Sequence, residues 1–250
     1  MFGILRAVAL SVVAGFGLFA CTTAPETGRS QLILVSDAEA NQMGAQAYQE
    51  IKSEKRISRD ARYTDPVVEI GQRIAAVSGR RDYDWEFTVF ADDTANAFAL
   101  PGGKVGVYTG MFDVAKTKAQ LAAVMSHEVG HVIARHSAER ISTQLVVQAG
   151  VGILGQGSSL LADAATLAII LPFSRTQESE ADVIGLKLMA RAGYDPREAI
   201  QLWQNMEAAG GARPPEFLST HPSPSSRIQR LQQLMPEAMQ DYRQSPYRGR

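Results

Sequence analysis

Regularly spaced apolar residues divide the first half of the chain into helices followed by short strands. Ser36 and Glu39 form a capping-box signature, which marks the start of a helix. Asp65 followed by Pro66 marks a second helix start, and Gly79 is its expected stop. The pattern predicts, in order, a short extended piece within residues 31–36, helices over 36–53 and 65–79, a strand over 84–92, and two extended segments within 96–110.

The second half of the chain is predicted to be almost entirely helical. A long helical pattern covers residues 116–141, and Ser174 with Gln177 caps a further helix that runs to the residue before Gly193. Asp195-Pro196 opens another helix. A proline-bounded loop then leads into a last amphipathic helix, and the final residues are expected to fray.

Residues 145–173 are apolar, rich in alanine and glycine, and nearly uncharged. Gly155–Ser159 and Asp163 break this segment into two stretches, each shorter than the roughly 20 residues that a membrane span requires. The pattern favours a helical hairpin, packed on the domain or touching lipid, over a transmembrane span.

The N-terminus has the layout of a secretory leader. Arg6 precedes a short apolar run, which is typical of a signal peptide rather than of a stable membrane span. The run ends in Leu18-Phe19-Ala20 before Cys21, the chain's only cysteine, and resembles a bacterial lipobox with a bulky Phe19. We therefore expect lipidation of Cys21. The alternative is a plain signal peptide with a chance cysteine. Thr22, rather than aspartate, favours the outer membrane over the inner one.

Composition sets the domain organisation and excludes several classes of protein. With 250 residues, 45% hydrophobic and 20% charged, the chain can form one domain with a real core. A net charge of -1 gives no electrostatic footprint for nucleic acid, and one cysteine excludes internal disulfides and cysteine-based metal cages. We expect a signal peptide over 1–20, a lipidated tether over 21–35, a single domain over 36–235 and a flexible tail over 236–250.

The predicted helix over 116–141 carries three titratable side chains in its apolar centre, in the sequence HEVGH. His127 and His131 are four residues apart, so they share one helix face and can reach one metal ion. Glu128 projects about 100° from His127, which suits a general base. Two zinc ligands and a base form the H-E-x-x-H pattern, and a pair of core histidines is the alternative. Gly130 costs about 1 kcal/mol relative to alanine, so we expect a neighbour to approach closely there.

A catalytic zinc site needs a third protein ligand and an open fourth position. His136 lies five residues after His131, about 140° round a continuous helix, and would point elsewhere. The metzincin pattern is excluded, because Ala134 and Ser137 stand where it requires glycine and histidine. A carboxylate is therefore the economical choice for the third ligand.

The helix that begins after Ser174 offers such a carboxylate. Glu178 and Asp182 are four residues apart and share a face, whereas Glu180 points away from Glu178. Glu178 as ligand would leave Asp182 placed to accept the free N–H of a ligating histidine. The plain alternative is that acidic residues at a helix start complement the helix dipole.

Four segments, in order, resemble peptidase family M48, the group that contains the CAAX-processing enzymes and HtpX. They are NAFALPGGKVGVYTGM, HEVGH, SRTQESEAD and STHPSPSSRI, and the resemblance covers about residues 30–235. It is greatest to the soluble, periplasmic lipoprotein members. It implies an α+β, zincin-like (gluzincin) domain, mostly helical, with a small β-sheet beside the active-site helix. It also implies one Zn²⁺ per chain on His127, His131 and Glu178, with Asp182 in support.

The resemblance also suggests where a substrate would bind. In zincins an edge strand lies across the cleft and pairs with the substrate backbone, and the candidate here is KVGVYTG, with Lys104, Val105, Gly106 and Val107. Asn96 would hold or cap this segment, or is a plain turn asparagine. Main-chain pairing is blind to side chains, so unfolded or extended polypeptides are the expected substrates.

His221 and Arg227 lie in the last of the four segments, which the resemblance places near the metal. His221 would stabilise the oxyanion or close over zinc as a removable fourth ligand, and a structural loop histidine is the alternative. Arg227 is a second candidate for the oxyanion donor.

These features predict a zinc-dependent endopeptidase with Glu128 as general base, acting on unfolded or misfolded cell-envelope proteins. We expect it in the periplasm, anchored through Cys21 to the outer membrane more than the inner, with outer-membrane assembly proteins or other proteases as partners. Serine catalysis lacks a G-x-S-x-G elbow, and Cys21 is not available for cysteine catalysis. One rival is a zinc-stabilised chaperone that binds without cutting, which would not need Glu128. The other is a lipid-anchored scaffold without metal.

Overall fold

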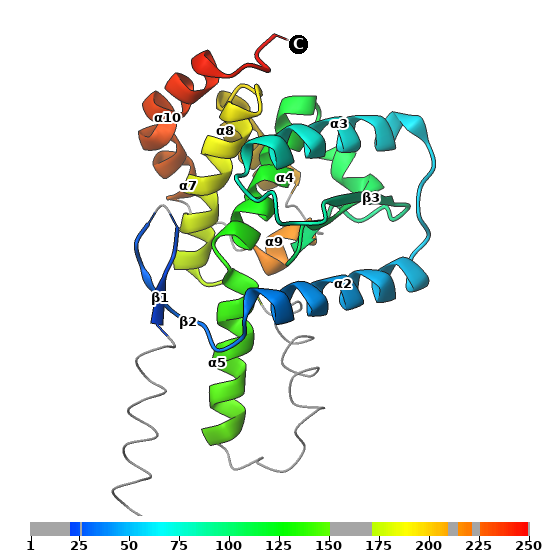
Figure 1. The fold of residues 1–250 in the computed structure, drawn as a ribbon. Coiled ribbons are helices and arrows are strands. Elements are labelled where there is room, and N and C mark those ends of the chain that lie inside the picture. Colours follow the sequence, from blue (N-terminus) through cyan, green and yellow to red (C-terminus); the bar gives the residue numbers. More distant parts are fainter. Residues whose placement is uncertain (1–20, 26, 151–171, 210–214, 222–225, 250) are drawn as a thin grey trace, which may run out of the picture.

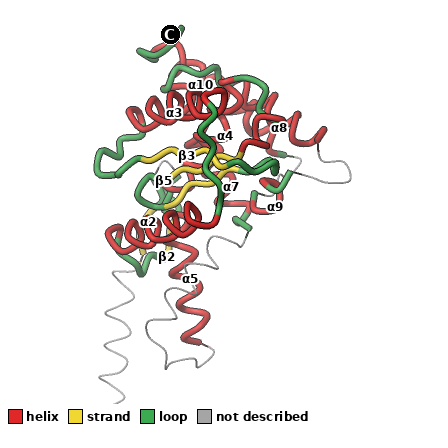
Figure 2. Tube along the Cα trace, turned by 90° about the vertical axis from the view of Figure 1, so that its right-hand side faces the viewer, coloured by secondary structure: helices red, strands yellow, loops and turns green. Residues whose placement is uncertain are grey.

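A small mixed β-sheet lies between helices on both of its faces (Figures 1 and 2). The computed structural model describes residues 21–25, 27–150, 172–209, 215–221 and 226–249. The elements are β1 (Cys21–Thr23), β2 (Ser30–Leu32), α2 (Asp37–Glu54), α3 (Ala61–Val77), β3 (Glu86–Phe90), β4 (Ala97–Leu100), β5 (Lys104–Tyr108), a 3-10 turn (Thr109–Asp113), α4 (Lys118–Ile133), α5 (His136–Gly150), α7 (Arg175–Arg191), α8 (Arg197–Ala209), α9 (Phe217–Thr220) and α10 (Arg227–Gln244). The expected α+β class, mostly helical with a small sheet, is confirmed.

The sheet has the strand order β3-β5-β4, with β5 parallel to β3 and antiparallel to β4. Successive side chains of a strand point to opposite faces. Val105 and Val107 therefore enter the main core with α3 and α4, while Tyr108 packs with Tyr48 of α2 on the other face. Burial on both faces explains why all five residues of β5 are buried.

The expectation that Lys104, Val105, Gly106 and Val107 form a free edge strand is wrong. β5 is paired on both sides, so its backbone groups are already used within the sheet. A Cβ on Gly106 would lie 2.3 Å from the Phe98 ring, so this glycine serves packing inside the sheet. Among the described residues, the strand next to α4 that keeps an unpaired side is β4.

Most helix starts follow the predicted capping signals. The capping boxes of Ser36 and Ser174 are both formed. α3 differs, since it begins at Ala61, where the Asp60 side chain accepts a hydrogen bond from the backbone of Arg62 at 3.0 Å. This cap lies upstream of Pro66, which the helix tolerates inside its first two turns.

The long helix predicted over 116–141 is two helices. Arg135 separates α4 from α5 and adopts the left-handed conformation, with φ of 58°. Its guanidinium pairs with Asp37 of α2 at 2.6 Å, which holds the bend. The break redirects every side chain after Ile133, so His136 does not lie where a continuous helix would put it.

α4 and α7 cross in close contact at the centre of the molecule (Figure 1). A Cβ on Gly130 would lie 2.8 Å from the carbonyl oxygen of Ala181, and one on Gly185 would lie 2.9 Å from the backbone of His127. Real Cβ atoms do not approach so closely, so the crossing requires glycine at both positions. The close approach expected at Gly130 is confirmed, and it sets the start of α7 against the HEVGH segment.

Both ends of the described chain are more ordered than predicted. The expected tether contains an antiparallel hairpin in which Cys21 pairs with Leu32, and Ile33 and Val35 are buried against α5. The expected flexible tail is helical to Gln244, because α10 continues through Pro236 and buries Ala238. The leader over 1–20 and most of the hairpin predicted over 145–173 lie outside the described residues. None of the described helices combines the length and hydropathy needed to cross a membrane.

Candidate metal centre

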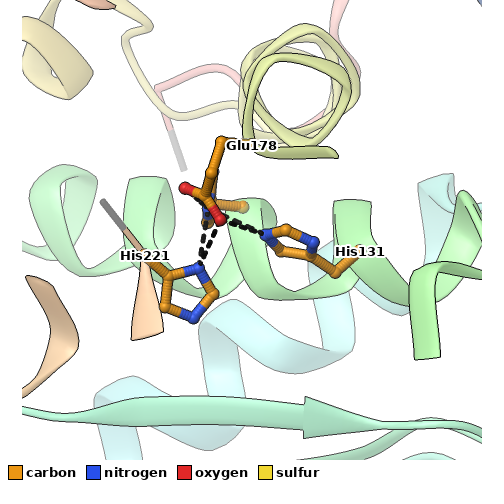
Figure 3. A group of neighbouring side chains, drawn as sticks. His131, Glu178 and His221 are labelled. Carbon is orange, nitrogen blue, oxygen red and sulfur yellow. Dashed lines mark hydrogen bonds and ion pairs between the residues drawn. The ribbon is translucent and has the colours of Figure 1, made fainter. Parts of the chain in front are cut away.

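Three imidazoles and one carboxylate converge at the crossing of α4 and α7. His127 and His131 come from α4, Glu178 from the first turn of α7, and His221 from the residue that ends α9. Their exposed fractions are between 1% and 4%. Figure 3 shows the Glu178 carboxylate between the rings of His131 and His221. The predicted ligand set is brought together, and His221 joins it.

The donor atoms lie close enough together to bind one ion, all within 4.8 Å of one another. His127 Nε2 lies 3.1 Å from His131 Nε2 and 3.5 Å from Glu178 Oε2, and His131 Nε2 lies 3.3 Å from Glu178 Oε1. His221 Nδ1 lies 3.4 Å from His127 Nε2 and 3.0 Å from Glu178 Oε1. Tetrahedral zinc with bonds of about 2.0–2.1 Å places neighbouring donors about 3.3 Å apart.

The chemistry of the donors also fits zinc. Two imidazole nitrogens that face each other share one hydrogen at most, so the pair formed by His127 and His131 leaves lone pairs directed at a common point. A cation at that point removes their repulsion. Imidazole nitrogen and carboxylate oxygen are ligands that zinc takes in catalytic sites. The site therefore fits one zinc ion.

Burial and neighbouring charges shift the pKa values of the donors in the chain without a cation. Burial alone would lower the pKa of His127, but the carboxylates of Asp182 and Glu178 raise it to about 9. Burial lowers the pKa of His131 well below its ordinary value despite the contact with Glu178. The pKa of Glu178 lies far below its ordinary range, because its contacts with three imidazoles outweigh its burial. Glu178 is thus an anion ready to bind a cation.

Glu128 stands beside this group without belonging to it. Its carboxylate is 2% exposed, and Oε1 lies 3.3 Å from His221 Nε2. Burial raises its pKa, while His221, His127 and a hydrogen bond from the backbone of Ala99 in β4 act in the opposite direction. A raised pKa suits a carboxylate that must take and return a proton.

Asp182 and Arg227 support the ligands from the far side. Asp182 Oδ1 lies 3.0 Å from Nδ1 of His127, as predicted for a carboxylate that orients a ligating histidine. Arg227 is 2% exposed, donates from Nε to Asp182 Oδ2 at 2.7 Å, and forms an ion pair with Glu178. Its guanidinium also stacks on Trp203. Its Nε and one terminal nitrogen are thus directed at the two carboxylates, while the buried Nη1 has no hydrogen-bond partner, so the role of oxyanion donor stays a prediction for Arg227.

Asn96 lies at the start of β4. Its side-chain oxygen accepts from the backbone N–H of Ala97 at 2.9 Å, and its amide nitrogen reaches Glu216 at 3.4 Å. Phe217 donates its backbone N–H to the carbonyl of Ala95, so the turn that carries His221 is tied to the beginning of β4.

His136 lies beside the ligands, although its spacing on a continuous helix predicts that it points elsewhere. It is fully buried, and its Nδ1 lies 2.8 Å from Nδ1 of His131, while its Nε2 lies 2.9 Å from Glu180 Oε2. The helix break at Arg135 turns it toward the site. Helices that end in a left-handed residue usually have glycine or asparagine there, so the arginine at 135 did not indicate a helix end in the sequence.

Comparisons with known proteins agree with this geometry. Residues 61–235 match peptidase family M48. The chain is 40% identical to mitochondrial metalloendopeptidase OMA1 of Schizosaccharomyces pombe, over 91% of this chain and 71% of that protein. It is 42% identical to mitochondrial metalloendopeptidase OMA1 of Arabidopsis thaliana, over 68% of this chain and 36% of that protein. It is 29% identical to the beta-barrel assembly-enhancing protease of Escherichia coli K12, over 95% of this chain and 53% of that protein. The chain therefore spans only about a third to a half of the last two relatives.

Proposed function

The chain belongs to peptidase family M48 and is a zinc metallopeptidase with a zincin-like fold, and we propose that it cleaves unfolded or misfolded proteins of the cell envelope. The observation that carries the proposal is the juxtaposition of a buried four-donor cluster with the separate carboxylate of Glu128. A purely structural zinc site would not need that carboxylate, so the site favours an enzyme over a zinc-stabilised chaperone.

The unpaired side of β4 indicates the conformation in which a substrate would bind. This strand contacts α4 and keeps one unpaired side among the described residues, and the backbone of Ala99 reaches Glu128. An extended polypeptide that adds to β4 would therefore pass directly by the base. Main-chain pairing holds the peptide without reading its side chains, so we infer a preference for unfolded segments. Asn96 fixes the start of this strand.

A bound zinc ion supplies Lewis acidity, which polarises a carbonyl group and lowers the pKa of water toward about 7. His127, His131 and Glu178 would hold the ion. Glu128 accepts a proton from the attacking water at its carboxylate and returns it to the nitrogen of the leaving amine. The contacts of Asp182 and Arg227 keep the ligands in place during both transfers.

His221 occupies the position that a substrate must reach. Its Nδ1 is the fourth donor of the cluster and lies 3.0 Å from Glu178 Oε1, and its ring stacks on Phe217 with centroids 4.4 Å apart. Catalysis on zinc needs an open fourth position. We propose that His221 closes the site at rest and withdraws when an extended chain binds, rather than serving mainly as the oxyanion donor.

The cellular setting is a further part of the proposal. The lipobox-like sequence before Cys21 and the residue Thr22 favour a periplasmic protein with a lipid anchor in the outer membrane. Similarity to a beta-barrel assembly-enhancing protease supports outer-membrane assembly proteins as partners. The two relatives with higher identity are named mitochondrial metalloendopeptidases, so their names do not support a periplasmic location. The proposed location therefore depends on the leader sequence of this chain. A Cys21→Ser protein that still partitions with membranes would count against the anchor or implicate the apolar segment over 145–173.

The decisive experiment compares wild type with Glu128→Gln at matched zinc content on a denatured protein substrate. We expect cleavage by wild type and a loss of at least about 100-fold in the variant, since the base is removed while the ligands remain. Equal rates would remove the catalytic role of Glu128. Binding by both proteins with cleavage by neither would favour the chaperone.

A further inference from the structure

We propose that His136 is a positioning residue for the zinc ligand His131, and that the N-terminal hairpin completes its support through Thr27 and Arg29. The N-terminal hairpin is the pair β1 and β2 together with residues 27–29 of their connection. The proposal rests on the zinc site alone, so its readout is zinc binding and does not depend on the substrates proposed above.

The direction of each hydrogen bond in this chain of contacts follows from the metal position. His131 turns Nε2 toward His127 and Glu178, so the lone pair of Nε2 faces the metal. The hydrogen of its neutral ring is then on Nδ1, which lies 2.8 Å from His136 Nδ1. Only one hydrogen fits between two ring nitrogens, so His136 must accept at Nδ1. Its own hydrogen is therefore on Nε2 and is donated to Glu180 at 2.9 Å.

The two ligating histidines of α4 are thus supported in parallel ways. His127 meets the carboxylate of Asp182 directly at 3.0 Å, whereas His131 reaches the carboxylate of Glu180 through the inserted ring of His136. Both carboxylates belong to α7. A carboxylate behind a ligating imidazole fixes its tautomer and ring orientation, and losing such a partner typically costs about 10- to 100-fold in metal affinity.

Glu180 is itself held by the N-terminal hairpin. Thr27 donates its hydroxyl to Oε1 at 2.5 Å, and Arg29 donates Nε to both oxygens at 3.0 Å and a terminal nitrogen to Oε2 at 2.9 Å. The other side of the Arg29 guanidinium binds Glu139 of α5 at 2.6 and 2.7 Å. These donors and His136 together fix one orientation of the Glu180 carboxylate. The N-terminal hairpin therefore holds the carboxylate at the far end of the hydrogen-bonded series that leads through His136 to the zinc ligand His131.

A simpler explanation is that Arg29 only neutralises two buried acids. The side chains of Glu139 and Glu180 are 13% and 5% exposed, and an arginine between them stabilises the fold whatever the metal does. That role predicts a loss of stability without a change in zinc affinity. Metal binding therefore separates the two explanations.

The experiment measures zinc affinity by competition with a chelator, and ligand geometry from the visible spectrum of the Co²⁺-substituted protein. We expect His136→Ala to weaken zinc binding by about 10- to 100-fold and to shift the Co²⁺ spectrum. His136→Asn keeps an acceptor near the Nδ1 position and loses the link to Glu180, so it should fall between wild type and alanine. Arg29→Ala should weaken zinc binding by about threefold or more, as a remote part of the same support.

The matched control is Arg191→Ala, which removes an ion pair with Asp241 of 3.0 Å from the opposite end of the same helix α7. It should leave zinc affinity and the Co²⁺ spectrum unchanged. The proposal is overturned if Arg29→Ala behaves like this control, or if His136→Ala binds zinc as wild type does. Should His136→Ala fail to fold, Glu180→Gln decides in its place, because it keeps the volume of the side chain while weakening both the His136 and the Arg29 contacts.

Discussion

Asp182 Oδ1 lies 3.0 Å from Nδ1 of His127, on the side of the ring opposite the Nε2 that faces the other donors. The contact places a carboxylate from α7, two turns from the start of that helix, behind a zinc ligand, where it favours the hydrogen on Nδ1. It also couples α10 to the site, because the other oxygen of Asp182 accepts from Arg227.

Asp182→Asn should weaken zinc binding by about tenfold or more, because an amide replaces an anionic acceptor behind His127. Chelator competition measures the change. The control is Asp241→Asn in α10, which removes the carboxylate from its ion pair with Arg191 of α7 and should bind zinc as wild type does. Equal affinity of Asp182→Asn and wild type would contradict the assigned role.

Glu178→Ala should abolish stoichiometric zinc after dialysis, since it removes the one anionic donor of the cluster. Metal analysis of the purified protein gives the result. Glu207→Ala on α8 removes an exposed acid and should retain one zinc per chain. Retention of zinc and full activity by Glu178→Ala would show that another residue supplies the third ligand.

His221→Ala should lower zinc affinity by about tenfold and yet raise the hydrolysis rate at saturating zinc, because the fourth position is open in the variant. Peptide hydrolysis measured across a range of zinc concentrations separates the two effects. A lower rate at saturating zinc would instead assign His221 to the oxyanion.

Gly130→Ala should destabilise the protein by about 1–3 kcal/mol, because the added Cβ would lie 2.8 Å from the carbonyl oxygen of Ala181. In an exposed helix the same substitution is stabilising by about 1 kcal/mol, so the sign alone is informative. Thermal unfolding of the metal-free protein measures it. A higher midpoint in the variant would mean that the helix crossing is looser than described.

Asp92 provides a pH-dependent contribution to stability away from the metal. Partial burial alone would raise its pKa, but hydrogen bonds from Lys55 and Thr94 lower it to about 2. A pKa below the unfolded value means stabilisation that is present above about pH 4 and lost as the pH falls toward 2. The difference in midpoint between wild type and Asp92→Asn, measured with chelator present, should therefore shrink on acidification. A difference independent of pH would contradict this role.

Local signals in the sequence were sufficient for the centre of the site. The spacing of His127 and His131 and the capping box at Ser174 depend only on neighbouring residues, and the structure has both as predicted. The approach of Glu178 could be inferred because one helix start offered a carboxylate on the correct face. The glycine at 130 pointed to a close neighbour, although only the structure identifies Ala181.

Features that depend on distant pairing were not predictable in this way. Strand order is one, because nothing within KVGVYTG distinguishes a central strand from an edge strand. The bend at Arg135 is another, since it is held by Asp37, nearly a hundred residues away in the chain. The roles proposed for His136 and Arg29 follow from that bend and from the docking of the N-terminal hairpin, so helical spacing could not predict them.

The pairing of Cys21 with Leu32 has a consequence for the reach of the enzyme. If a lipid is attached at this residue, the folded body begins at the bilayer surface, and the arginine that supports the zinc site follows only eight positions later in the chain. Such a protease could not diffuse freely through the aqueous space. It would act on polypeptides that are themselves delayed at the membrane, which would select its substrates by location where its binding strand does not select them by sequence.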